Sequence, residues 1–182
     1  MNIALFLQMA AEACPDRPAL THHGKHYTYA QLFSAAKRAA LYFSTGNCKF
    51  VCLLDTSSPA TPIALMGAAI AGIPYVPLNY RLSEEQITPL LDRISPAYLI
   101  SGPRNETYDF DGWVVQDSAD FLSDVLNGEE VEVTWHEDPS AVAVQLFTSG
   151  TTGIPKAALL RHEHLVSYIL GSVEFMGALE DE

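Results

Sequence analysis

Nine consecutive residues carry the clearest chemistry in this sequence. Residues 148–156 read Thr-Ser-Gly-Thr-Thr-Gly-Ile-Pro-Lys and follow an apolar run. Gly150 and Gly153 allow positive φ angles and a close approach of ligand to backbone, so that successive N–H groups can converge on an anion. Pro155 stiffens the exit, and Lys156 supplies a positive charge. Four residues add hydroxyls that donate to phosphate oxygens or face a metal ion: Thr148, Ser149, Thr151 and Thr152. These residue types predict a loop that binds a polyphosphate.

The loop differs from the Walker A phosphate loop. That motif places Ser or Thr after a Gly-Lys pair, whereas Lys156 follows a proline and precedes the apolar run 157–160. The run predicts a strand, so the anion site would depend on N–H groups, hydroxyls and Lys156 more than on a helix dipole. The alternative is a hairpin turn that binds nothing. Such a turn needs only about two to five residues and no Pro-Lys ending, which favours the ligand-binding loop.

The segment resembles the phosphate loop of the adenylate-forming superfamily, which includes acyl-CoA synthetases, firefly luciferase and the adenylation domains of peptide synthetases. Residues 27–32 (Tyr-Thr-Tyr-Ala-Gln-Leu) and 66–82 resemble two further segments of that superfamily in the same order. The ending Leu-Asn-Tyr-Arg-Leu at 78–82 is more similar to acyl-CoA synthetases than to peptide-synthetase domains. One departure is Ala157, where most members have glycine. In a strand the added methyl group should be tolerated.

The resemblance implies an ATP-dependent acid–CoA ligase acting on fatty acids through an acyl-adenylate, with ATP, Mg²⁺ and coenzyme A as cofactors or co-substrates. The resemblance implies that the phosphates are bound by Thr148, Ser149, Gly150, Thr152 and Gly153. It implies that the Thr151 hydroxyl lies nearest to the magnesium ion, and that Lys156 pairs with a phosphate oxygen or holds the loop closed. Thr151 and Lys156 are thus the predicted catalytic residues. Three alternatives stay open: an acyl-AMP ligase that serves a carrier protein, an aryl-acid ligase, and a non-catalytic fragment that binds a nucleotide or a partner.

Members of the superfamily carry further segments that the sequence lacks. These are the aromatic-Gly-x-Thr-Glu segment that frames adenine, the aspartate that holds the ribose, and a C-terminal domain with a catalytic lysine. We therefore expect residues 1–182 to be the N-terminal part of the AMP-binding domain of a longer enzyme, inactive by itself. A sheet cut short in this way would expose an apolar face, so a homodimer is an option.

Composition excludes some classes of function. Asp and Glu number 22 against 10 Lys and Arg, and a net charge of −12 argues against nucleic acid as a partner. Three cysteines are too few for a disulfide framework and favour a reducing, cytoplasmic setting. No apolar run reaches the roughly 18 residues of a transmembrane helix, and the first residues lack the basic start of a signal peptide.

Strands that alternate with helices predict an α/β fold with a largely parallel sheet flanked by helices. Strands are expected at 50–54, 75–78, 97–100, 113–116, 141–147 and 157–161, and a hairpin at 19–22 and 25–27. Helices are expected at 2–13, 28–46, 58–71, 83–94, 119–126 and 162–175. Thr28 with Gln31 and Ser83 with Gln86 have capping-box spacing. Ligands of parallel sheets lie at the carboxyl ends of strands, where the loop after Phe147 begins.

Other residues have chemistry available to them, such as metal binding or substrate contact, but structural roles are expected. We predict that His22, His23 and His26 lie in an exposed hairpin and that His162 and His164 are polar residues at the start of a helix. Tyr75, Tyr80 and Arg81 are expected to pack against neighbouring residues, and residues 55–58 to cap the following helix. Cys48 and Cys52 are expected to be buried apolar residues, which could face one side of their strand.

Overall fold

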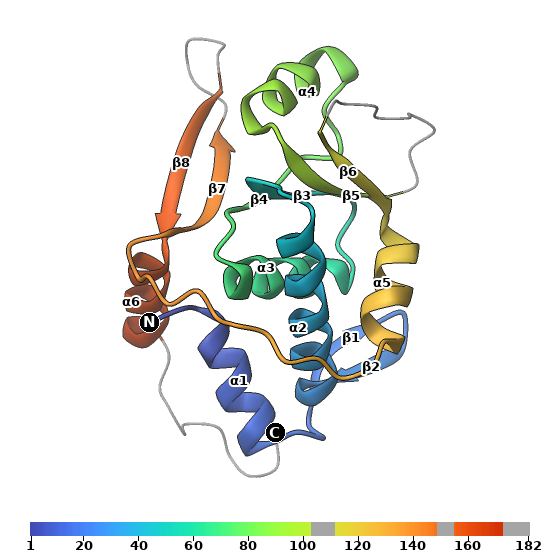
Figure 1. The fold of residues 1–182 in the computed structure, drawn as a ribbon, viewed down its shortest axis with the longest axis vertical. Helices are drawn as coiled ribbons and strands as arrows, with labels where there is room; N and C mark the ends of the chain where they lie inside the picture. Colours follow the sequence, from blue (N-terminus) through green and yellow to red (C-terminus); the bar gives the residue numbers. More distant parts are fainter. Residues whose placement is uncertain (103–111, 149–154, 173–182) are drawn as a thin grey trace.

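The fold is a six-stranded sheet covered by helices, with a separate two-stranded hairpin (Figure 1). The structure is a computed structural model and describes residues 1–102, 112–148 and 155–172. The large sheet contains β3 (Phe50–Leu54), β4 (Tyr75–Pro77), β5 (Ala97–Ser101), β6 (Val114–Asp117), β7 (Val142–Thr148) and β8 (Lys156–Arg161). The hairpin contains β1 (Pro18–His22) and β2 (Lys25–Thr28). The helices are α1 (Ala4–Ala13), α2 (Tyr29–Thr45), α3 (Ala60–Ala71), α4 (Glu84–Leu91), α5 (Ser118–Asn127) and α6 (His162–Ser172), and a short 3-10 turn, η1 (Asp92–Ile94), follows α4.

The strand order across the large sheet is β6-β5-β3-β4-β7-β8. β3 pairs in parallel with both β4 and β5, β5 pairs in parallel with β6, and β4 pairs in parallel with β7 through Tyr75 and Val144. Only the last strand, β8, runs antiparallel to its neighbour β7. The predicted α/β fold with a largely parallel sheet is therefore confirmed.

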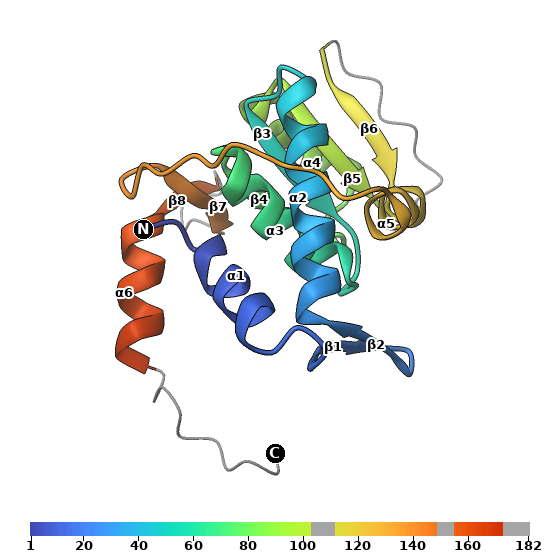
Figure 2. The ribbon, with the colours of Figure 1, turned by 60° about the horizontal axis from the view of Figure 1, so that its bottom comes forward.

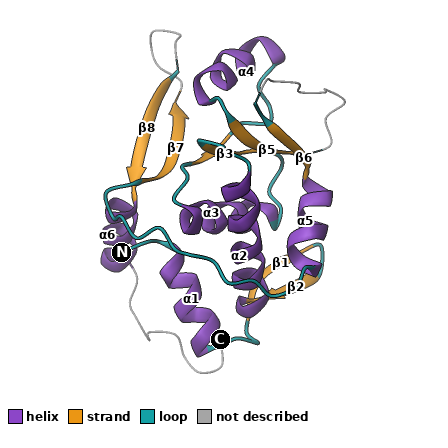
Figure 3. Cartoon of the chain, viewed as in Figure 1, coloured by secondary structure: helices purple, strands orange, loops and turns teal. Residues whose placement is uncertain are grey.

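Helices cover both faces of this sheet (Figures 2 and 3). Alternate residues of β3 point to opposite faces, as in any strand. Val51 and Leu53 pack in the core beneath α1, α2, α3 and α5, whereas Cys52 and Leu54 pack against α4. Cys48 lies in the first core and Cys52 in the second. Both cysteines are buried as predicted. The prediction that they face one side of the strand was wrong, because Cys48, which precedes β3, and Cys52, within β3, pack on opposite faces of the sheet.

Local capping signals place the helix ends. Gln31 Oε1 accepts a hydrogen bond from Thr28 N at 2.9 Å, and Thr28 Oγ1 accepts one from Gln31 N at 3.2 Å, so both halves of the predicted capping box form. α3 ends at Gly72, whose φ of 73° is the left-handed conformation that glycine adopts without strain.

The backbones of α2 and α3 approach closely at Gly67. A Cβ atom built on Gly67 would lie 2.8 Å from Ala39 Cβ and 3.0 Å from the carbonyl oxygen of Ala36. The facing positions of both helices are mostly alanine, with Ala35, Ala36, Ala39 and Ala40 buried on α2 and Ala60, Ala64 and Ala68 buried on α3. Small side chains allow the two helix backbones to pack tightly against each other, and the pair covers the face of the sheet to which Val51 and Leu53 of β3 and Tyr75 of β4 point.

A buried polar cluster ties the amino terminus to three other segments. The Asn2 side-chain amide donates to the carbonyl oxygens of Ala69 and His136, at 2.6 and 2.9 Å, and its oxygen accepts from Ala4 N at 2.9 Å. Nδ1 of His162, which is 1% exposed, accepts from Ile3 N at 3.3 Å. Asn2 is 5% exposed, so these bonds satisfy polar groups that water does not reach.

The buried His162 predicts a loss of stability in mild acid. Burial lowers the pKa of His162, and the charges of His136 and the N-terminal amino group lower it further, while Asp138 opposes them. Because the pKa in the unfolded chain is about 6.5, the unfolded state binds more protons than the folded state just below that pH. The free energy of unfolding should therefore be highest above about pH 6.5 and fall as the solution is acidified towards the lower folded pKa. Urea unfolding midpoints measured between about pH 7.5 and 5.5 check this.

The His162→Asn variant is the control for that titration, because it keeps an acceptor near Ile3 N but does not gain a proton. Its unfolding midpoint should depend less steeply on pH than that of the unchanged protein. Equal slopes in the two proteins would show that another group causes the loss.

Within residues 1–102, 112–148 and 155–172, no helix combines the length and the apolar character needed to cross a bilayer.

Candidate functional site

The structure describes the two ends of the predicted phosphate loop. Thr148 is the last residue of β7, and Lys156 is the first residue of β8. The predicted site residues Ser149, Gly150, Thr151, Thr152 and Gly153 lie outside the described residues. The site is therefore described at its base, where the loop leaves β7 at Thr148 and enters β8 at Lys156.

The base of the loop is closed by strand pairing. Thr148 and Lys156 form the last pair of the β7–β8 ladder, next to the pair Phe147–Ala157. Thr148 Oγ1 also donates to the carbonyl oxygen of Lys156 at 3.3 Å. Both residues are exposed, so the hydroxyl and the ammonium lie where a ligand can reach them.

The predicted strand after the loop is confirmed by this ladder. Ala157 lies within β8 and has no positive φ angle, so the methyl group that replaces the glycine typical of the superfamily causes no backbone strain there. The start of β8 directly at Lys156 also excludes a helix N-terminus at this point.

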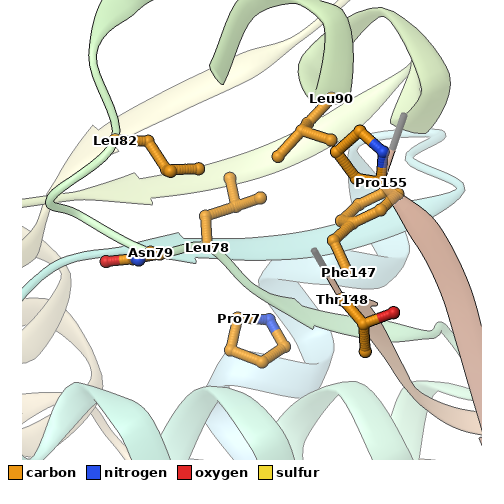
Figure 4. A pocket seen from close by; sticks show the side chains of 8 residues that line it. All are labelled: Pro77, Leu78, Asn79, Leu82, Leu90, Phe147, Thr148 and Pro155. Atoms are coloured by element: carbon orange, nitrogen blue, oxygen red, sulfur yellow. The ribbon is translucent and has the colours of Figure 1, made fainter. Parts of the chain in front are cut away.

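A pocket of about 270 Å³ lies beside the loop base (Figure 4). Because β7 runs parallel to β4, the carboxyl ends of the two strands meet at the same edge of the sheet. The end of β4 and the segment after it supply Pro77, Leu78, Asn79 and Leu82, α4 supplies Leu90, and the loop base supplies Phe147, Thr148 and Pro155. The lining is mostly apolar, with Asn79 and Thr148 as its polar members. The predicted position of the site at the carboxyl edge is thus where the structure has this hollow.

The side chain of Arg93 contacts the loop base, and the sequence did not indicate this contact. Arg93 Nη1 donates to the carbonyl oxygen of Pro155 at 2.7 Å, and its guanidinium carbon lies 5.0 Å from the centre of the Phe147 ring. Arg93 belongs to η1 and is 62 residues away from Pro155 in sequence. No local pattern around Arg93 predicts a contact over this separation.

The segment after β3 behaves as a local turn at the same edge. Asp55 Oδ1 accepts from Thr56 N at 2.6 Å, and Ser58 Oγ accepts from Ala60 N at 3.3 Å at the start of α3. The N-cap residue of α3 is Pro59, which makes no side-chain hydrogen bond, so the predicted cap within 55–58 is one residue off. Ser58 still accepts from the first N–H of the helix, and Asp55 stabilises the turn. Gly102, which follows β5, lies so close to Asp55 that a Cβ built on Gly102 would overlap Asp55 Oδ1.

The predicted packing of Tyr80 and Arg81 was wrong. Tyr80 and Arg81 are exposed rather than packed, and the Arg81 guanidinium lies over the Tyr80 ring at 5.4 Å. The predicted helix-start position of His162 is confirmed, because His162 begins α6, and its side chain is buried, with Nδ1 accepting from Ile3 N. In both cases the outcome depends on which distant segment covers the residue, and the sequence does not show this.

The other structural predictions are confirmed. His164 Nδ1 accepts from Arg161 N at the start of α6. Tyr75 is 3% exposed and packs in the core, where its hydroxyl finds no hydrogen-bond partner among the described residues. His22, His23 and His26 lie in or next to the strands of the β1–β2 hairpin, where His23 and His26 are exposed and His22 is half-buried.

Comparison with known proteins shows to which family the chain belongs. Residues 7–181 match the family described as AMP-binding enzyme. The chain is 30% identical over 183 residues to one of the plipastatin synthase subunits of Bacillus subtilis, covering 98% of this chain and 7% of that protein. It is 25% identical over 164 residues to D-alanine--D-alanyl carrier protein ligase of Staphylococcus aureus, covering 89% of this chain and 32% of that protein.

A solved structure has the same fold. The o-succinylbenzoate CoA synthetase of Bacillus subtilis, bound with its product analogue OSB-NCoA, superposes with a TM-score of 0.75 at 26% identity over 97% of this chain and 37% of that one. The chain thus spans between 7% and 37% of the length of these relatives. The family match covers nearly all of the sequence, and the superposition shows that the fold of the sheet and its helices is shared with that enzyme. This chain belongs to the AMP-binding enzymes of the adenylate-forming superfamily.

Proposed function

We propose that the protein is an ATP-dependent acid–CoA ligase that activates a fatty acid as an acyl-adenylate. The observation that carries the proposal is the closed base of the glycine- and hydroxyl-rich loop, with Thr148 and Lys156 paired at the carboxyl edge of a parallel sheet. Ligands of such sheets bind at this edge. The fatty acid is the narrower part of the proposal and depends on the resemblance of residues 78–82 to acyl-CoA synthetases.

The chemical problem in this reaction is charge. The substrate carboxylate attacks the α-phosphorus of ATP, the bond to the β-phosphate bridging oxygen breaks, and pyrophosphate leaves with the electron pair. The thiol of coenzyme A then attacks the acyl carbonyl carbon, loses its proton and expels AMP. Both reactants in the first step are anions, so groups that stabilise negative charge on the phosphates lower the barrier.

The residues at the loop base fit a phosphate chain. The ammonium of the exposed Lys156 is a point charge that suits phosphate oxygens, and the Thr148 hydroxyl donates to the backbone carbonyl of the same residue. We assign phosphate binding to Thr148, Ser149, Gly150, Thr152 and Gly153, and the hydroxyl nearest to Mg²⁺ to Thr151. Oxygen ligands such as a threonine hydroxyl suit Mg²⁺, which, when bound, neutralises phosphate charge.

A carrier-protein ligase is the second candidate. Its support is the similarity to the D-alanine--D-alanyl carrier protein ligase, at 25% identity. The first half-reaction is the same in both candidates, and only the acceptor differs. An aryl acid in place of a fatty acid would likewise change the acid pocket and leave the phosphate loop unchanged.

The test separates the two half-reactions in the full-length protein. ATP–pyrophosphate exchange is measured with short, medium and long fatty acids, with benzoate, and with D-alanine. We expect exchange that depends on a fatty acid, followed by a thioester when coenzyme A is added, detected by mass spectrometry. Transfer to a phosphopantetheinyl carrier protein but not to coenzyme A would support the second candidate. If no acid supports exchange, the proposed function is wrong.

A further inference from the structure

The two carbonyl oxygens of the loop exit are each held by a side chain from another part of the chain. We call Pro155 and Lys156 the exit dipeptide. Its first carbonyl accepts from Arg93 Nη1 at 2.7 Å, and its second accepts from Thr148 Oγ1 at 3.3 Å. A residue whose own carbonyl and preceding carbonyl are both fixed has little freedom left in its backbone. Lys156 is that residue.

Arg93 is well placed to act as a fixed support. It lies in the short turn η1, between Leu91 and Ile94, which are 1% and 0% exposed in the core beneath α4. Its guanidinium lies over the ring of Phe147, 5.0 Å from the ring centre. An arginine over an aromatic ring gains a cation–π attraction, which favours this placement of the guanidinium. Arg93 thus contacts the last part of β7 and the loop exit at once.

We propose that Arg93 is a positioning residue that fixes the exit dipeptide and thereby aims the Lys156 ammonium at the phosphates. The proposal rests on the proposed function for the reaction, but the contact itself is independent of it. Arg93 does not need to touch a substrate. Its hydrogen bond goes to the carbonyl oxygen next to Lys156, and preorganised charge is more effective than charge on a free chain because no reorganisation is needed during the reaction.

The test uses Arg93→Met and Arg93→Lys in the full-length protein. Methionine keeps an apolar stem against Phe147 and removes both the charge and the hydrogen bond. We expect kcat/KM for MgATP in ATP–pyrophosphate exchange to fall about tenfold with an unchanged KM for the acid, a loss equal to about 1.4 kcal/mol. Lysine keeps the charge and one donor but loses the planar contact, so it should restore part of the loss. Arg17 directly precedes β1, and β1 lies far from β7 (Figure 1), so Arg17→Met is the charge-matched control and should keep full activity.

A double substitution decides whether Arg93 acts through Lys156. In the Lys156→Ala background, Arg93→Met should cause no further loss of exchange, because the group that it positions is gone. An additional tenfold loss would overturn the proposal and place Arg93 in direct contact with the nucleotide. Full activity of the single variant Arg93→Met would overturn it as well.

A second measurement does not depend on activity. Amide hydrogen exchange of peptides that cover residues 155–161 should be faster in Arg93→Met than in the unchanged protein, and unaltered in Arg17→Met. If the unchanged protein shows no ATP–pyrophosphate exchange with any acid, the proposed function fails. The positioning role is then decided by hydrogen exchange alone, and equal rates in Arg93→Met and the unchanged protein would overturn it.

Discussion

Replacing Lys156 by alanine is expected to slow ATP–pyrophosphate exchange about a hundredfold in the full-length protein. Lys156 is paired with Thr148 at the closed base of the loop, and its ammonium group is the one that we propose stabilises charge on the leaving phosphates. Removal of one such group from a preorganised site typically costs about a hundredfold or more in rate. Thr151→Ala should cause a loss of similar size, since it removes the hydroxyl assigned to Mg²⁺.

The matched control for this loss is Lys49→Ala. Lys49 is an exposed lysine that precedes β3, at the opposite edge of the sheet from the loop. It should keep full exchange activity, and Lys156→Ala should unfold at the same temperature as the unchanged protein because Lys156 is exposed. Unchanged exchange in both Lys156→Ala and Thr151→Ala would remove the loop from the mechanism.

Replacing Gly67 by leucine should lower the free energy of unfolding by about 3 kcal/mol or more. The space that a Cβ needs at Gly67 is taken by the Cβ of Ala39 and the carbonyl of Ala36. Neither atom is at the end of a flexible side chain, so α2 and α3 must move apart, and overpacking of a tight core typically costs about 1–3 kcal/mol even for smaller groups. Urea unfolding followed by circular dichroism measures the effect.

Gly171→Ala is the control for a helical glycine without this constraint. A Cβ on Gly171 in α6 meets no atom within 4 Å, so alanine should be neutral or slightly stabilising, because it favours the helix by about 1 kcal/mol relative to glycine. A loss at Gly67→Leu no larger than the change at Gly171→Ala would contradict the close approach of α2 and α3.

Local signals were enough to predict the secondary structure and the fold class. The capping pair Thr28 and Gln31 forms both of its hydrogen bonds, and Gly72 ends α3 in the left-handed conformation. These features depend on residues within one turn of each other, so the sequence contains all the information that they need. The pairing of Thr148 with Lys156 was predictable for the same reason, because a strand, a loop and a strand follow one another directly.

Contacts between distant segments were not predictable from one sequence. Arg38 of α2 carries a charge, yet it is only 8% exposed, and it donates to the carbonyl oxygens of Val125 and Glu129 around the end of α5. The hydrogen bonds of Arg93 to the Pro155 carbonyl and of Ile3 N to His162 likewise join segments far apart in the sequence. In each case the partner is chosen by how the helices pack on the sheet, which no short pattern records.

The junction between β4 and β7 has a mechanical consequence. Among the described residues the two strands are joined through the single pair Tyr75–Val144, whereas β7 and β8 are paired from Val142 to Thr148. Under a shearing load the sheet should therefore part between β4 and β7 before the β7–β8 hairpin opens. The hairpin would then come away as one piece, with its two strands still joined.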